Sequence, residues 1–100
     1  MKGSVIYFTK IQERRANEKF ENILYGYDLM GIKCIQIRKS LYSIVATFEN
    51  GDRWELLRPS ENLRGRKFNI SYVPREPNED EIILVKAMTV AHPYNGIIYY

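Results

Sequence analysis

The feature that most constrains this chain is an amphipathic segment that runs from Gln12 to about Leu29. Charged side chains fill one side of the segment, while apolar residues recur at helical spacing on the other. These apolar residues are Ala16, Phe20, Ile23, Leu24 and Tyr27. The preceding run from Ser4 to Thr9 is short, β-branched and aromatic, as is typical of a central strand. Together the two segments predict a helix that packs against a β-sheet.

Five further segments have the composition of strands. They are residues 32–37, 41–49, 53–58, 67–73 and 97–100. Arg38-Lys39-Ser40 is the expected exit turn of the first of these segments. Asn50-Gly51 lies between the second and the third, and Asn-Gly supplies the positive φ angles that tight turns require. We therefore expect a β-hairpin centred on this pair.

Residues 78–90 favour a second helix, because Asn78 is a good N-cap and acidic residues follow it in the first turn. The β-branched run at 82–85 leaves a strand open for the same segment. With a helix there, the element order is β-α-β-β-β-β-α-β. This order predicts an α/β fold with a mixed sheet and two helices packed on it, with an α+β fold as the alternative.

The length and composition indicate one globular domain over residues 1–100. A chain of 100 residues can bury one core, and 45% hydrophobic with 27% charged residues is typical of folded proteins. No apolar run is long enough to cross a bilayer, and the start of the sequence is too short for a signal peptide. We therefore expect a cytoplasmic protein without a membrane segment.

The inventory of reactive side chains argues against an enzyme. Cys34 is the only cysteine and His92 the only histidine, and nothing in the sequence brings the two together. We expect Cys34 to be a small buried hydrophobic residue. The junction after the first strand lacks the glycines of a phosphate-binding loop. We predict no cofactor and no metal, although a pair of carboxylates for hydrolysis stays open.

Positive charge is better organised than any catalytic group. The candidate binding residues are Arg53, Trp54, Arg58, Arg64, Arg66, Lys67, Tyr72 and Arg75. Arginines interleaved with aromatic rings suit contacts to phosphates combined with base stacking. The alternative is that the arginines are a solvated face and the aromatic residues belong to the core, and for the aromatic residues we favour this alternative.

A stretch covering roughly residues 41–75 resembles a known family. Its motifs are Phe48-Glu49-Asn50-Gly51-Asp52-Arg53-Trp54, then Arg64-Gly65-Arg66, then the strand Phe68 to Val73. They are similar to the middle of the ATPase domain of bacteriophage terminase large subunits. The resemblance implies a phage or prophage origin and a P-loop-like sheet. Pro74 and Arg75 stand where that family has its acidic pair, so the resemblance implies a degenerate relative without ATPase activity.

Two functions follow as hypotheses. The first is a non-enzymatic module that binds nucleic acid through the region from Arg53 to Arg75. The second is an effector or inhibitor of a host protein that uses the same arginines together with some of the eight tyrosines. A homodimer stays open, because an edge strand at residues 97–100 could pair with a second copy.

Overall fold

The computed structural model describes residues 1–41, 43–59, 67–89 and 96–100. It contains one mixed sheet of six strands and two helices, which confirms the predicted fold class and element order. In chain order the elements are β1 (Lys2–Ile6), α1 (Lys10–Leu29), β2 (Cys34–Lys39), β3 (Ser43–Phe48), β4 (Arg53–Leu57), β5 (Ile70–Val73), α2 (Glu79–Met88) and β6 (Ile97–Tyr99).

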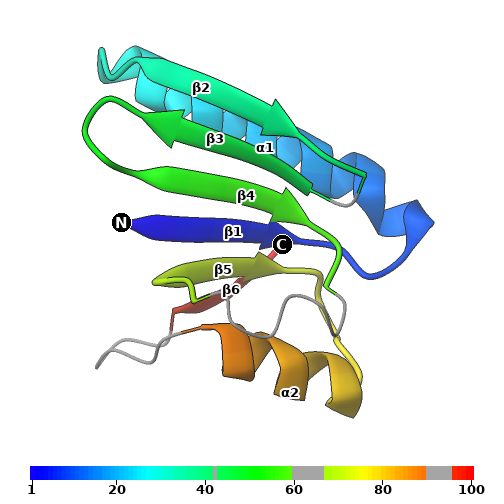
Figure 1. The fold of residues 1–100 in the computed structure, drawn as a ribbon. Coiled ribbons are helices and arrows are strands. Elements are labelled where there is room, and N and C mark those ends of the chain that lie inside the picture. The colour runs from blue at the N-terminus through cyan, green and yellow to red at the C-terminus, as the bar shows by residue number, and fades with distance from the viewer. Residues whose placement is uncertain (42, 60–66, 90–95) are drawn as a thin grey trace.

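The strands lie in the order β2-β3-β4-β1-β5-β6 (Figure 1). β1 is central, as predicted, and pairs in parallel with both β4 and β5. β6 pairs in parallel with β5 on the far side. β2, β3 and β4 pair antiparallel as a meander, so β3 alone runs against the other five strands.

α1 begins at a complete capping box around Thr9. The Gln12 N–H donates to Thr9 Oγ1 over 3.3 Å, and Gln12 Oε1 accepts the N–H groups of Thr9 and Phe8 over 3.2 and 2.8 Å. The helix therefore starts slightly before the predicted position, and β1 ends at Ile6 rather than at Thr9. α1 covers one face of the sheet, where Ala16, Phe20 and Tyr27 join the core.

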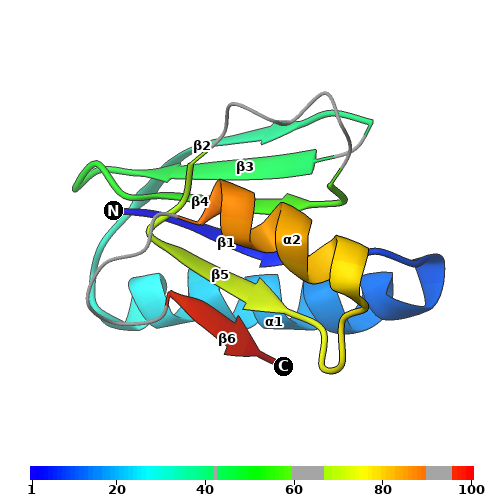
Figure 2. The ribbon, with the colours of Figure 1, turned by 90° about the horizontal axis from the view of Figure 1, so that it is seen from below.

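α2 is a helix because its cap outweighs the β-branched residues inside it. Asn78 Oδ1 accepts the Glu81 N–H over 2.8 Å, and Glu81 Oε1 accepts the Asn78 N–H over 2.9 Å. The buried side chains of Val85 and Met88 fasten α2 to the face of the sheet opposite α1. Figure 2 shows that α2 does not extend over β2 and β3. In the described parts of the chain, neither helix is both long and apolar enough to cross a membrane.

The predicted hairpin is present between β3 and β4. Gly51 has a φ of 92°, a left-handed value that glycine adopts without strain. The Gly51 N–H donates to the Phe48 oxygen over 3.0 Å, and the Phe48 N–H donates to the Asp52 oxygen over 2.9 Å. These bonds close the turn and set the register in which Thr47 lies opposite Arg53.

Two expectations about β2 are wrong. Arg38 and Lys39 belong to the strand rather than to an exit turn. Cys34 is exposed rather than buried, and so are the other residues of β2. The reason is the strand order, because β2 lies at the outer edge of the sheet and, among the described strands, pairs with β3 alone (Figure 1).

Candidate functional site

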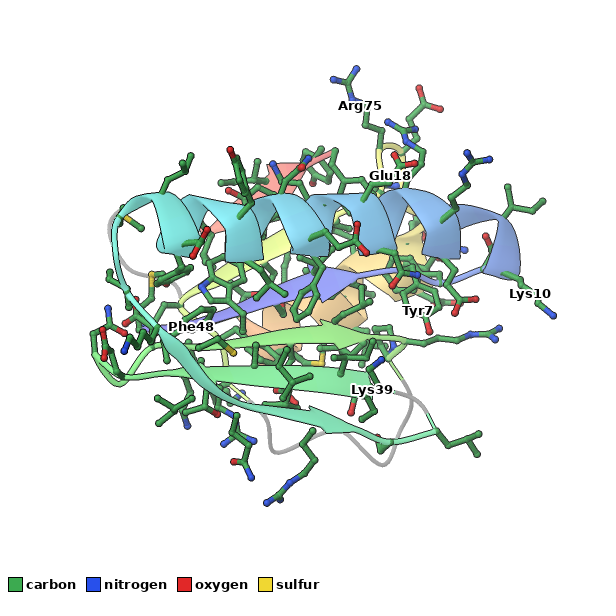
Figure 3. The ribbon with its side chains drawn as sticks, turned by 90° about the horizontal axis from the view of Figure 1, so that it is seen from above. Tyr7, Lys10, Glu18, Lys39, Phe48 and Arg75 are labelled. Carbon is green, nitrogen blue, oxygen red and sulfur yellow. The ribbon has the colours of Figure 1, made fainter. Side chains whose placement is uncertain are left out.

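The predicted binding residues do not form one surface. Arg53 begins β4 and Lys67 precedes β5, so both lie at the amino-terminal edge of the parallel strands. Arg58 and Arg75 follow the ends of β4 and β5, at the opposite edge. Figure 3 shows Arg75 projecting away from the body of the molecule. The predicted residues Arg64 and Arg66 lie outside the described residues.

Lys67 has a structural partner. Its ammonium donates to the carbonyl oxygen of Ala87 over 2.5 Å, in the last turn of α2. A cation at this position is favourable because unpaired carbonyls carry partial negative charge at the end of a helix. Lys67 therefore stabilises α2 in addition to carrying charge at the surface.

Trp54 belongs to the core. This agrees with the alternative favoured from sequence, in which the aromatic residues are core residues rather than stacking partners. Only 4% of its surface is exposed. Its ring lies against Gly3, where an added Cβ would come within 2.5 Å of the ring atoms. Its indole N–H donates to the Tyr27 hydroxyl over 2.9 Å, and that hydroxyl donates to Asp52 Oδ2 over 2.6 Å. Both faces of the indole are covered, so a base cannot stack on Trp54 in this structure.

Tyr72 is half-buried on the same face of the sheet as Trp54. The two rings are 6.0 Å apart between centroids. The Lys19 ammonium lies 4.4 Å from the centroid of the Tyr72 ring, a cation–π contact made from α1. Tyr72 thus supports the packing of α1, and its ring is engaged within the protein.

The strand register brings together a set of cations that sequence reasoning missed. Lys2 lies beside Arg53, and Arg53 lies beside Thr47, which lies beside Gln36. Residues paired in this way share one face of a sheet.

Arg38 occupies the next row of the same face, beside Val45. We call this set, Lys2, Gln36, Arg38, Thr47 and Arg53, the basic sheet face. It faces away from α1, because Arg53 alternates with the inward-facing Trp54. All of its cations are exposed. Among the described residues, no helix lies over its β2 and β3 portion (Figure 2).

The alternation of side chains in β4 could have indicated part of this arrangement from sequence. Arg53 and Trp54 are adjacent, so they must point to opposite faces. In the sequence, Lys2 lies 51 residues from Arg53, and Arg38 lies 15 residues from it. The pairing of β1 with β4 places Lys2 on the face of Arg53, and the pairing of β2 with β3 and of β3 with β4 places Arg38 there.

The carboxyl ends of β1 and β5 form the position where open α/β sheets commonly bind ligands. The chain leaves β1 through α1 toward one side of the sheet, and leaves β5 through α2 toward the other. Such a reversal opens a crevice between the strand ends. Here the Tyr100 hydroxyl donates to the Ile6 oxygen over 2.6 Å, and the Arg75 N–H donates to the Tyr100 oxygen over 3.2 Å. Burial raises the pKa of Tyr100 to about 12, so its hydroxyl remains protonated and keeps donating.

A small polar cavity of about 120 Å³ lies near the end of β1, beside α1. Its polar lining comprises Tyr7, Glu13, Asn17, Ser40 and Ser43. Figure 3 shows Tyr7 and Lys39 toward the end of the sheet away from Phe48. Burial, reinforced by the charge of Glu13, raises the pKa of the Tyr7 hydroxyl, while Arg58 acts in the opposite direction. Ligand pockets typically hold about 300 Å³ or more, so this cavity suits a few water molecules better than an organic ligand.

The described residues contain no group of three His, Cys, Asp or Glu side chains placed to hold a metal ion. His92 lies outside the described residues. Comparison of the chain with protein families, with curated proteins and with solved structures found no match.

Proposed function

We propose that this protein is a non-enzymatic binding module that contacts nucleic acid through the basic sheet face. The observation that carries the proposal is the strand register, which places Lys2 and Arg53 side by side and Arg38 in the next row. Three exposed cations on one sheet face can contact successive phosphates of a nucleic-acid backbone. The net charge of +3 is compatible with an anionic partner.

The contact is expected to involve phosphates rather than bases. Trp54 and Tyr72 lie on the other face of the sheet, so they are not available to stack beside Arg53. Phosphate contacts position a protein but carry no direct sequence information. The proposed module therefore binds without strong sequence preference, and its affinity depends steeply on salt.

The proposal retains part of the surface expected from sequence. Arg64 and Arg66 stay in it as predicted contacts, since they belong to the segment that joins β4 to Lys67. Arg58 and Arg75 are not part of the proposed contact surface, because they lie at the opposite edge of the sheet from Arg53. A phage or prophage origin, with action in the host cytoplasm, rests on the resemblance of residues 41–75 to terminase ATPase domains.

The test is binding of labelled single-stranded DNA, duplex DNA and RNA across a salt series, followed by fluorescence anisotropy. The variant Arg38→Ala/Arg53→Ala removes two cations from the basic sheet face. Each lost contact to a duplex phosphate should lower the slope of log affinity against log salt by about 0.9, so the double variant should lose about 1.8. Its stability should change little, because both side chains are exposed.

The matched control is Lys10→Ala/Arg14→Ala, which removes the same charge from exposed positions of α1. This control should keep the wild-type salt slope if the basic sheet face is the contact surface. Equal losses in both variants would mean that net charge alone drives binding. Absence of binding at low salt would reject the nucleic-acid module and favour the second hypothesis, an effector of a host protein.

A further inference from the structure

Within the part of the chain that the structure describes, the outer edge of β2 is an unpaired backbone edge. β2 is the last strand on its side of the sheet, and no described residue pairs with its outer side. Its six residues are all exposed. The strand at the other end of the sheet, β6, has only three residues. Unpaired edges are templates for another strand, so the longer one is the better candidate for an interaction.

The direction of the backbone groups in β2 follows from a bond at its end. The Ser40 N–H donates to the Ser43 oxygen over 2.8 Å, which points it toward β3. In an antiparallel ladder the direction of the backbone groups alternates from residue to residue. The N–H and C=O groups of Arg38, two residues before Ser40, therefore also point toward β3. The N–H and C=O groups of Ile37 and Lys39 therefore point outward, away from the sheet.

The side chains around these outward groups combine an apolar residue with two cations. Ile37 is 52% exposed and lies beside Ala46, on the α1 face. Lys39 lies beside Ile44 on that face, and Arg38 lies on the opposite face. A strand added to this edge would meet an apolar surface at Ile37 and a positive charge on each face of the sheet.

Charge argues against a second copy of β2 as the occupant. The sequence from Leu29 to Phe48 contains Lys33, Arg38 and Lys39 but no acidic residue. Pairing β2 with itself would bring together four cations, Arg38 and Lys39 of each copy, in two adjacent strands that contain no carboxylate. Like charges close together across strands are destabilising, whereas opposite charges are favourable. The edge therefore selects an acidic partner.

We propose that the outer edge of β2 binds an extended acidic peptide segment of a partner protein as an added antiparallel strand. Two consecutive acidic residues of the segment lie opposite Lys39 and Arg38, and the next residue, β-branched and apolar, lies opposite Ile37. Backbone bonds to Ile37 and Lys39 supply affinity, and the side chains supply specificity. This surface shares Arg38 with the basic sheet face, but the strand edge and Lys39 belong to it alone, because Lys39 lies on the other face from Arg53. The Lys39→Glu variant therefore tests the edge without changing the basic sheet face.

The first test uses the synthetic peptide Thr-Glu-Glu-Val-Thr-Val-Thr and a control in which both glutamates are lysine. Calorimetry should detect binding of the acidic peptide only. Lys39→Glu should weaken binding about tenfold, whereas Lys10→Glu, an equal charge change on α1, should leave it nearly unchanged. A peptide with lysine opposite position 39 should recover affinity for Lys39→Glu. Equal weakening by both variants, or no binding of the acidic peptide by the wild type, would overturn the proposal.

The second test locates the added strand by amide hydrogen exchange measured with NMR. The N–H groups of Ile37 and Lys39 should exchange rapidly in the free protein and slowly with the acidic peptide bound. The N–H of Arg38 should be protected in both states, because it already bonds to β3. Peptide binding without protection of Ile37 and Lys39 would refute strand addition. Protection of both amides without peptide, together with a dimer in sedimentation, would identify a second copy as the occupant instead.

Discussion

The two faces of the sheet are held by different chemistry. The face under α1 is aromatic: Tyr27 stacks on Phe48 with ring centroids 3.9 Å apart, and Trp54 bonds to the Tyr27 hydroxyl. The face under α2 buries mostly aliphatic side chains, with Phe68 as an aromatic member, and it contains a chain of hydroxyl groups. Ser4 donates to Ser71 over 2.8 Å, and Ser71 lies 2.9 Å from the Thr89 hydroxyl.

This difference shows how one strand can serve two purposes. Within β4, Trp54 anchors the aromatic face, while its neighbour Arg53 belongs to the basic sheet face. α1 has 20 residues and packs on β1, β2 and β4, whereas α2 has 10 residues. The shorter helix does not reach β2 and β3 (Figure 2), and among the described residues that part of the sheet face carries exposed cations. The comparison predicts that substitutions of buried residues on the α1 face lower the free energy of unfolding more than substitutions on the α2 face.

The largest effect is expected from Trp54→Ala. Truncating a buried tryptophan leaves a large cavity and typically costs about 3 to 5 kcal/mol. It also leaves the Tyr27 hydroxyl without the indole donor. Urea unfolding followed by circular dichroism would measure the loss. A cost below about 1 kcal/mol would mean that the aromatic face does not dominate the stability of the fold.

A smaller loss is expected from Ser71→Ala on the α2 face. The Thr89 hydroxyl donates to the Val85 oxygen over 2.9 Å, so it must accept from Ser71, which in turn accepts from Ser4. Removing the middle hydroxyl leaves the buried Ser4 donor unpaired, at a cost of about 1 to 3 kcal/mol. Ser4→Ala/Ser71→Ala should then cost less than the sum of the two single variants. Additive costs in the urea series would contradict a connected chain.

The smallest effect is a pH dependence at the rim of the aromatic face. The hydrogen bond from Tyr27, followed by that from the Met1 amino group, lowers the pKa of Asp52. A carboxyl group with a lowered pKa stabilises the fold above its unfolded pKa of about 3.9, and this stability is lost as the pH falls through the folded pKa. The free energy of unfolding should therefore fall below about pH 4. Thermal unfolding of Tyr27→Phe should show a weaker fall over the same range, and an identical pH profile would exclude this bond as the cause.

Sequence alone determined which segments became helices and strands. The helix after β1 follows from apolar spacing, α2 from the cap at Asn78, and the hairpin from Gly51. Each of these signals is local, since it depends on residues within one or two turns of each other. Cys34 was misjudged because its burial depends on the position of β2 in the sheet, which no local pattern reports.

Tertiary structure decided which charged residues meet. Arg53 and Arg58 are close in sequence but lie at opposite ends of β4, about 16 Å apart at roughly 3.3 Å per residue. Lys2 and Arg53 are distant in sequence yet adjacent, because β4 returns to pair with β1. Strand pairing is a long-range choice made by the burial of whole faces. The amino-acid sequence therefore determined the elements, whereas the order of strands determined the basic sheet face and the open edge of β2.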